Sequence, residues 1–294
     1  MSAFSRSLEL AKQSFHVLRQ DPELMVFLVF SVLATLAALL TFAGIGFMSG
    51  ALGEGGLTSS GLVLMFLFYF VTYGVTIYFQ VALVTSVQHR LSGGDPTVRY
   101  GLREANKRIA AILSWAIIAA IVGMILKMLE NAVRERSSGI GQIIASIGLS
   151  LVGMAWSLAT FFVIPVIAAE NVGGFEAVKR SAGIIKRQWG EAVIGNAGVG
   201  LIAFVIILVG GAILGGMAYI GFSMGGPLGT TMGVLFLIAA IAFVAVVSLV
   251  SSTLQAIYTT VLHRYATGGV SSEYFSSDLI NGAFKRQQPS SGWM

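Results

Sequence analysis

Six long runs of apolar residues dominate the chain. They cover residues 24–47, 61–87, 109–129, 143–169, 192–222 and 230–262, and shorter segments rich in charge and glycine separate them. A helix of about 20 residues crosses a hydrocarbon layer about 30 Å thick, and each run reaches that length. The pattern therefore predicts an all-α integral membrane protein with six transmembrane helices arranged as three hairpins.

Positive charge is concentrated at one set of ends of these runs. If the six runs cross the membrane in alternation, 15 of the 18 Lys and Arg residues lie on one side, and only Lys127, Arg134 and Arg136 lie on the other. Cytoplasmic loops carry an excess of Lys and Arg, so the split places the N- and C-termini in the cytoplasm. For a prokaryotic chain this predicts a multi-pass protein of the cytoplasmic (inner) membrane.

Shorter amphipathic segments accompany the apolar runs. In residues 4–19, apolar side chains recur at spacings of three and four among basic ones, which is typical of a helix that lies in the membrane interface. Similar segments precede the third and fifth runs, and another follows the sixth. The predicted single membrane domain, 1–294, thus divides into an interfacial helix 4–19, hairpin 1 at 24–87, an interfacial helix plus hairpin 2 at 98–169, an interfacial helix plus hairpin 3 at 174–262, and a C-terminal interfacial helix 272–286.

The ends of the even-numbered runs resemble one another. The second run ends with His89-Arg90 followed by Gly93-Gly94, the sixth ends with His263-Arg264 followed by Gly268-Gly269, and the fourth is followed by Gly173-Gly174. Three tandem units, each an interfacial helix with a hairpin, explain this repetition. The alternative is that Gly-Gly simply ends a helix at a membrane boundary.

Composition agrees with a membrane location. The hydrophobic fraction is 56%, only 11% of residues are charged, and the mean hydropathy is +0.85, whereas soluble domains carry about 25% charge. No stretch is long enough for a separate soluble domain. Charged residues interrupt residues 1–23, which predicts that the first run is an uncleaved anchor. The chain has no cysteine, which excludes disulfides and thiolate chemistry.

One segment carries a family resemblance. The stretch from Phe162 to Ser181, which includes Pro165, Glu170-Asn171-Val172-Gly173-Gly174 and Lys179-Arg180, and is followed by Trp189, resembles the signature of uncharacterised six-span bacterial membrane families. Those families are similar in turn to the membrane domain of some glycerophosphoryl diester phosphodiesterases. The resemblance implies the six-span fold. It implies no activity, because the soluble phosphodiesterase barrel is absent from this sequence.

Groups that carry catalysis are scarce. All three histidines, His16, His89 and His263, fall at or outside the cytoplasmic boundary, and the sequence has no paired intramembrane carboxylates, no metal-ligand spacing and no phosphate-binding loop. We therefore predict no catalytic, cofactor-binding or metal-binding residues, no cofactor, no nucleic-acid partner and no enzymatic activity.

Polar residues within the runs are the remaining candidates for a transport path. Gln80, Asn196 and Gln255 lie inside the membrane, and Tyr69, Tyr73 and Tyr78 follow one stretch of the second run. The two glutamines favour hydrogen bonds between helices over solute binding. Lys127 and Glu130 lie near the outer end of the third run, where their side chains can reach water.

A polar cluster at the cytoplasmic end is a second candidate. His89, Glu170 and His263 occupy equivalent places if the three hairpins surround a common axis. One alternative is a solvated boundary with unrelated charges. Another is that Glu170 pairs with Lys179 or Arg180 and fixes the following helix to the membrane plane.

Glycine is abundant, with 36 residues, and the fifth run carries a ladder of them. Gly211 and Gly215 form a Gly-x-x-x-Gly pair, which permits close packing of helix backbones in lipid. The partner helix belongs either to the same chain or to a second copy.

These patterns favour a non-enzymatic membrane protein. Basic amphipathic helices on one side suit a membrane scaffold, a membrane-shaping protein or a self-assembling homo-oligomer that binds anionic membrane lipids. The alternative is a transporter or channel-like protein for a lipid or small amphiphile. The expected lipid-facing basic residues are Arg6, Lys12, Arg19, Arg99, Arg103, Lys107, Arg108, Lys179, Arg180, Lys186 and Arg187.

The charge split generates a topological prediction. Because the chain has no cysteine, a single cysteine placed at Ser59 or Ser137 should react with an impermeant maleimide added to intact cells. Cysteines at Ser92 and Ser271 should react only after permeabilisation. Labelling at Ser92 in intact cells would reverse the orientation.

Overall fold

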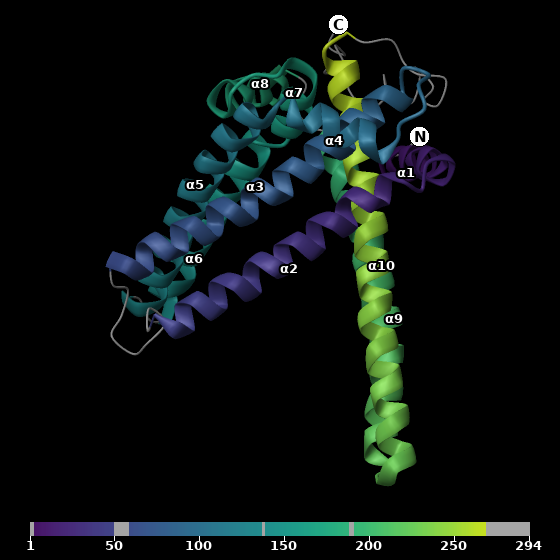
Figure 1. Cartoon of the computed structure of the whole chain (residues 1–294). Coiled ribbons are helices and arrows are strands. Elements are labelled where there is room, and N and C mark those ends of the chain that lie inside the picture. Colours follow the sequence, from purple (N-terminus) through teal and green to yellow (C-terminus); the bar gives the residue numbers. More distant parts are fainter. Residues whose placement is uncertain (1–2, 50–58, 137–138, 188–190, 269–294) are drawn as a thin grey trace, which may run out of the picture. The chain divides into compact units, whose positions relative to one another are not determined.

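The computed structural model describes residues 3–49, 59–136, 139–187 and 191–268, and every regular element in them is an α-helix (Figure 1). The helices in chain order are α1 (Ala3–Gln20), α2 (Leu24–Met48), α3 (Ser59–Arg90), α4 (Val98–Asn106), α5 (Ile109–Arg136), α6 (Gly139–Ala159), α7 (Val163–Glu170), α8 (Gly174–Arg187), α9 (Glu191–Ser223) and α10 (Gly226–Ala266).

Six stretches of the described residues are long and apolar enough to cross a membrane, which confirms the predicted all-helical fold with six candidate spans. These spans cover Leu24–Met48, Ser60–Arg90, Ile109–Glu135, Gly139–Glu170, Gly200–Ser223 and Gly226–Ala266. Large apolar side chains are exposed along them, as expected of helices that face lipid. The predicted helix 272–286 lies outside the described residues.

The chain forms two compact units. One comprises residues 1–25 and 189–294, and includes α1, α9 and α10. The other comprises residues 26–188, and includes α3 to α8 and nearly all of α2.

The core of the second unit lies at one end of its long helices. The last turns of α3, from Val81 to Val87, are buried there, together with Ile112 and Ala116 near the start of α5. The short helices α4 and α7 pack against α3, and α8 packs against α5, α6 and α7. Away from this end, aromatic rings also meet between helices: the centroids of Phe42 of α2 and Phe68 of α3 lie 5.8 Å apart.

Helix α4 is fixed to this core by a close approach at Gly101. The Thr97 side chain caps the helix by accepting a hydrogen bond from the Tyr100 backbone N–H at 3.2 Å. A Cβ on Gly101 would lie 2.5 Å from the Phe27 ring and 2.8 Å from the Ala82 carbonyl oxygen. Only glycine therefore lets α4 pack this closely against α2 and α3.

The fourth span is interrupted, although the sequence predicted one continuous run at 143–169. Residues 160–162 form turns between α6 and α7. Pro165 has no N–H to donate to the carbonyl one helical turn earlier, which explains why the helix breaks here. The backbone N–H of Phe162 is buried at the break and donates to the Ser181 side chain of α8 at 2.9 Å.

The start of α8 is held by α5. The Gly174 backbone N–H donates to the Ser114 hydroxyl at 2.8 Å, and a Cβ on Gly174 would lie 2.6 Å from the Cα of Trp115. Trp115 in turn stacks on Trp156 of α6 with a centroid distance of 5.8 Å. The break in the fourth span and the start of α8 are therefore stabilised by side chains from neighbouring helices.

In the first unit, α9 and α10 pack against each other along most of their length (Figure 1). Helix α10 has 41 residues and is about 60 Å long at 1.5 Å per residue, twice the thickness of a hydrocarbon core of about 30 Å. Glycines set the separation of the pair: a Cβ on Gly221 would lie 2.6 Å from the backbone nitrogen of Gly233, and one on Gly233 would lie 2.6 Å from the Phe222 ring.

The glycine pair singled out in the sequence lies elsewhere on α9. A Cβ added to Gly211 or Gly215 would meet no described atom within 4 Å. The neighbouring Gly210 is the glycine that the Phe243 ring of α10 covers. The close contact inside the chain thus uses Gly210, Gly221 and Gly233, and the expected partner of Gly211 and Gly215 stays a prediction.

Substitutions at the covered and at the open glycines of α9 should therefore differ in their effect on stability. Gly221→Leu should lower the free energy of unfolding by about 1–3 kcal/mol, because the new side chain overlaps the backbone of α10. In monomeric protein, Gly211→Leu with Gly215→Leu should leave the melting temperature within about a degree or two, because neither added side chain meets a described atom of the same chain. Thermal unfolding in detergent measures both. Equal destabilisation by the two variants would contradict this packing.

Candidate functional site

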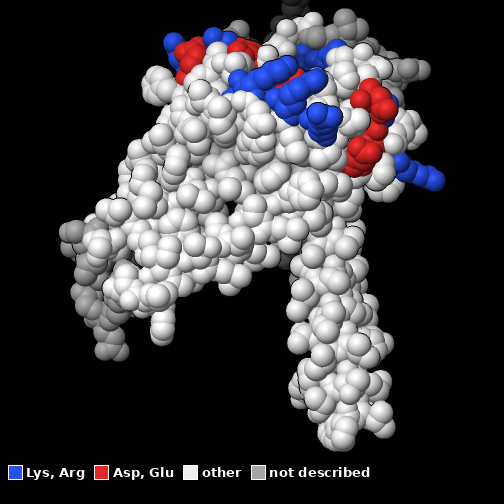
Figure 2. All heavy atoms as spheres, viewed as in Figure 1, with Lys and Arg blue, Asp and Glu red and all other residues white. Residues whose placement is uncertain are grey.

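The segment 98–108 presents basic side chains at the core end of the second unit. It carries four cations, Arg99, Arg103, Lys107 and Arg108, and one carboxylate, Glu104. Arg99, Arg103 and Lys107 are exposed, and Arg103 lies over the Tyr100 ring at 5.7 Å. Figure 2 shows Lys and Arg side chains gathered over α4 and α8.

Glu104 organises the charges of this segment. Its carboxylate accepts hydrogen bonds from Lys107 Nζ at 2.6 Å and from Arg108 at 3.0 Å, and Arg103 lies 3.9 Å away. The hydrogen bond from Lys107, followed by that from Arg108, lowers the pKa of Glu104 below its usual 4.5. The carboxylate therefore stays charged and holds Arg108 against the start of α5.

Helix α8 carries the second basic group, also with four cations and one carboxylate in its own sequence. Arg180 pairs with Glu170 at the end of α7 and with Glu176 at 2.9 Å, so the pairing of Glu170 with Arg180, one of the alternatives from the sequence, is present. That this pair fixes the helix to the membrane plane stays a prediction. Lys179 and Lys186 are exposed and form no ion pair with a described residue. Phe175 is 78% exposed beside these charges.

The other predicted basic residues lie in α1 or at the end of α8. Lys12 and Arg19 of α1 are exposed, on a helix that buries Ser14, Val17 and Leu18. The side chains of Arg6 and Arg187 lie outside the described residues.

The structure describes ring or ion-pair partners for two members of the predicted polar cluster. His89 stacks on Tyr100 with a centroid distance of 4.3 Å, and Glu170 pairs with Arg180. His263 is buried in α10, which belongs to the other unit. A direct meeting of His89, Glu170 and His263 stays a prediction.

Two of the three predicted intramembrane polar residues have described side chains. Gln255 donates to Ser251 of the same helix at 3.2 Å, and its amide lies 4.0 Å from the position of a Cβ on Gly200 of α9. Gln80 is half-buried on α3. The side chain of Asn196 lies outside the described residues.

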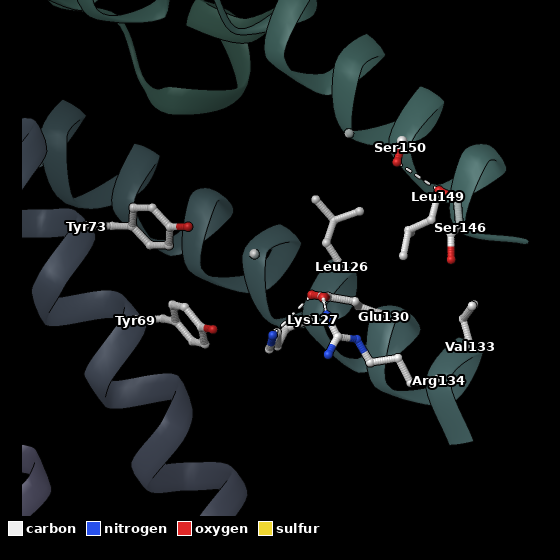
Figure 3. Close-up of a pocket in the computed structure, with 12 residues that line it drawn as sticks. Tyr69, Tyr73, Leu126, Lys127, Glu130, Val133, Arg134, Ser146, Leu149 and Ser150 are labelled. Carbon is white, nitrogen blue, oxygen red and sulfur yellow. Dashed lines mark hydrogen bonds and ion pairs between the residues drawn. The ribbon is translucent and has the colours of Figure 1, made fainter. Parts of the chain in front are cut away.

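A cleft lies between α3, α5 and α6, toward the end of these helices opposite the core. Its volume is about 540 Å³. Figure 3 shows Tyr69 and Tyr73 pointing into it from α3, Leu126, Lys127, Glu130 and Arg134 on α5, and Ser146 and Ser150 on α6. Polar groups from three helices thus share one hollow with apolar wall residues.

The charged side chains of this cleft form ion pairs, but their charges do not cancel. Glu130 accepts from Lys127 at 3.1 Å and from Arg134 at 2.8 Å, which leaves one excess positive charge. Lys127 and Arg134 are 47% and 69% exposed, and each keeps further N–H donors. Tyr69 and Tyr73 are stacked with centroids 5.9 Å apart, and neither hydroxyl forms a hydrogen bond to another described residue.

The sequence marks Tyr69 and Tyr73 as polar residues of a span and Lys127 and Glu130 as boundary charges. It does not show that the four residues share a cleft. The spacing of Lys127, Glu130 and Arg134 places them on one face of a helix, which is a usable signal. The contributions of Ser146, Ser150 and Gly153 follow only from the way α6 packs.

These features define a multi-pass, all-helical membrane protein with a basic end and an opposite polar cleft. The chain belongs to DUF6159, a family of unknown function, which matches residues 59–273, from α3 through α10. No curated protein matches the chain. The family agrees with the predicted resemblance to uncharacterised membrane proteins, but it provides no link to the membrane domain of glycerophosphoryl diester phosphodiesterases.

The lowered pKa of Glu104 predicts a pH-dependent contribution to stability. A carboxylate whose folded-state pKa lies below 4.5 stabilises the fold fully above that pH, and the contribution is lost as pH falls through the folded-state pKa. Glu104→Gln should therefore lower the melting temperature by several degrees at pH 7, and the difference from wild type should shrink as the pH falls below 4.5 and through the folded-state pKa. Glu135→Gln, which removes an exposed carboxylate on α5, is the control for the loss of one carboxylate. A deficit of Glu104→Gln that stays the same at every pH at which the protein is folded would exclude the charge effect.

Proposed function

We propose that this protein is a non-enzymatic membrane scaffold that binds anionic lipid through basic helices in the cytoplasmic leaflet of the inner membrane. The observation that carries the proposal is the pair of basic segments 98–108 and 174–187, each with four cations and one carboxylate in its sequence. Both segments belong to the same compact unit and cover its core.

The arrangement of these segments suits a lipid headgroup layer. Arg99, Lys179 and Lys186 are exposed and form no ion pair with a described residue, so they are available to phosphate groups. The exposed Phe175 supplies an apolar group that would insert between the lipids. A cation near an anionic surface contributes about 1 kcal/mol, and the contribution falls as salt rises.

Self-association is the second part of this proposal. Gly211 and Gly215 form an open Gly-x-x-x-Gly face on α9, which is suited to close contact with a second copy. On this proposal, Gly211→Leu with Gly215→Leu converts an oligomer into folded monomers, as measured by mass photometry in nanodiscs. A wild-type protein that stays monomeric across lipid compositions would remove self-assembly from the proposal.

The alternative, a transporter or channel-like protein for a lipid or small amphiphile, is favoured by one observation. The cleft between α3, α5 and α6 places hydroxyl and charged groups within candidate spans, where polar groups are costly unless they serve a function. A cleft at one end of a unit supports binding, while transport needs a path that continues to the other side.

Lipid binding by the basic segments can be tested with a double variant that breaks no described ion pair. Arg99→Gln with Lys186→Gln should reduce the affinity of the purified full-length protein for phosphatidylglycerol about fivefold per cation removed, which corresponds to about 1 kcal/mol each. Native mass spectrometry of protein titrated with phosphatidylglycerol or phosphatidylcholine measures the bound lipid.

The control is Glu135→Gln, which changes one exposed charge near the opposite end of α5 at a residue that belongs neither to the basic segments nor to the cleft lining. On this proposal, the control retains most of the phosphatidylglycerol bound by wild type, and added salt weakens wild-type binding. Equal loss in the double variant and in the control, or equal binding of the two lipids by wild type, would contradict a specific role of the basic helices.

A further inference from the structure

The position of the cleft along the membrane normal is set by α5. Lys127 lies 18 residues after Ile109, which corresponds to about 27 Å at 1.5 Å per residue and nearly spans a hydrocarbon core of about 30 Å. Gly123, which also lines the cleft, lies one turn deeper. If α5 enters the hydrocarbon at Ile109 and crosses it without tilt, the cleft extends from the hydrocarbon into the headgroup region of the leaflet opposite the basic end.

The cleft combines charged groups with apolar wall residues. Lys127, Glu130 and Arg134 of α5 supply the charges, and Leu126 and Val133 of α5 with Leu149 of α6 supply the apolar walls. The two tyrosine hydroxyls face the cleft without a hydrogen-bond partner among the described residues (Figure 3). A ligand that fits these walls has a polar head and an apolar tail.

The net charge of the cleft determines which kind of headgroup it binds best. Three charged side chains line the cleft with one net positive charge, and the cations retain N–H groups that Glu130 does not use. This arrangement favours one negative charge, such as a phosphate diester, over a zwitterion, because a charged acceptor forms the stronger hydrogen bonds with these cations. The described residues contain no group of three or more His, Asp or Glu side chains suited to a metal ion.

We propose that the cleft between α3, α5 and α6 binds a membrane amphiphile with an anionic headgroup. Lys127 and Arg134 hold the headgroup, the hydroxyls of Tyr69 and Tyr73 donate hydrogen bonds to it, and the wall formed by Leu126 and Leu149 holds the start of the tail. The volume of about 540 Å³ is within the usual 300–1,000 Å³ of small-molecule sites. This site is independent of lipid binding at the basic end.

The absence of cysteine permits a direct test of occupancy. Ser146 lines the cleft and is exposed, and the described bond that it accepts from Ser150 uses its backbone oxygen, so Ser146→Cys keeps that bond. In full-length protein held in a neutral maltoside detergent, the rate at which a water-soluble maleimide labels this thiol reports the empty fraction of the cleft. A cysteine at the exposed Ser92 is the reference, and its rate should not change.

Three probes distinguish the contribution of the headgroup to binding from that of the tail. Lysophosphatidylglycerol should slow labelling of Ser146→Cys about tenfold when about nine-tenths of the clefts are occupied, because only empty protein reacts. Lysophosphatidylcholine, with the same tail and a zwitterionic head, should slow it at least several-fold less. Inorganic phosphate, which has no tail, should leave the rate unchanged. Equal protection by the two lysolipids, protection by phosphate alone, or no protection would overturn the proposal.

Two variants of the cleft test the roles of its residues, and the variant of the basic helices is their control. Lys127→Gln with Arg134→Gln should abolish protection by lysophosphatidylglycerol, whereas Arg99→Gln with Lys186→Gln should retain it, which separates this site from the basic helices. Gly153→Leu places a side chain in open space at the cleft wall and should abolish protection with all charges intact. Protection that survives both cleft variants would overturn the proposal, as would loss of protection in the variant of the basic helices.

Discussion

The backbone's need for hydrogen bonds is the constraint on which this structure depends. Hydrocarbon offers no partner for an N–H or C=O group, so each span is a helix, and each interruption needs a substitute partner. At the break between α6 and α7, Ser181 supplies that partner for the buried N–H of Phe162. At the start of α8, Ser114 does the same for Gly174. Two hydroxyl groups thus join the short helices to the long ones where the backbone leaves its regular path.

The same constraint concentrates the core at one end of the second unit. Where α3 and α5 meet the short helices α4, α7 and α8, small residues such as Gly101 and Gly174 allow backbones to approach closely. Elsewhere the long helices expose apolar side chains to lipid and need little contact with one another. The core end carries the basic surface, while a polar cleft lies between α3, α5 and α6 toward their opposite ends.

Turn chemistry also recurs at the ends of the even-numbered spans. Gly93 after α3, Asn171 after α7 and Gly268 after α10 all have positive φ angles, of 84°, 51° and 82°. A left-handed residue ends a helix by redirecting the chain, and Gly and Asn adopt that conformation at the lowest cost. This shared geometry agrees with the repeated sequence at these positions. It is equally expected of any helix that must stop at a membrane boundary.

The sequence by itself determined the six apolar helices and the segregation of positive charge. It also named the pairing of Glu170 with the following helix, as one of two alternatives to the polar cluster. Those features depend on composition and on spacing within one helix or between neighbours in sequence. Tertiary structure decided which glycines are covered, because Gly210 and Gly211 differ only in the face of α9 that they occupy. It also decided that Tyr73, Lys127 and Ser146 share a cleft, since residues from three helices meet only after those helices pack. Apolar runs specify that a helix spans the membrane, but they carry little information on its rotation, which is set by contacts with its neighbours.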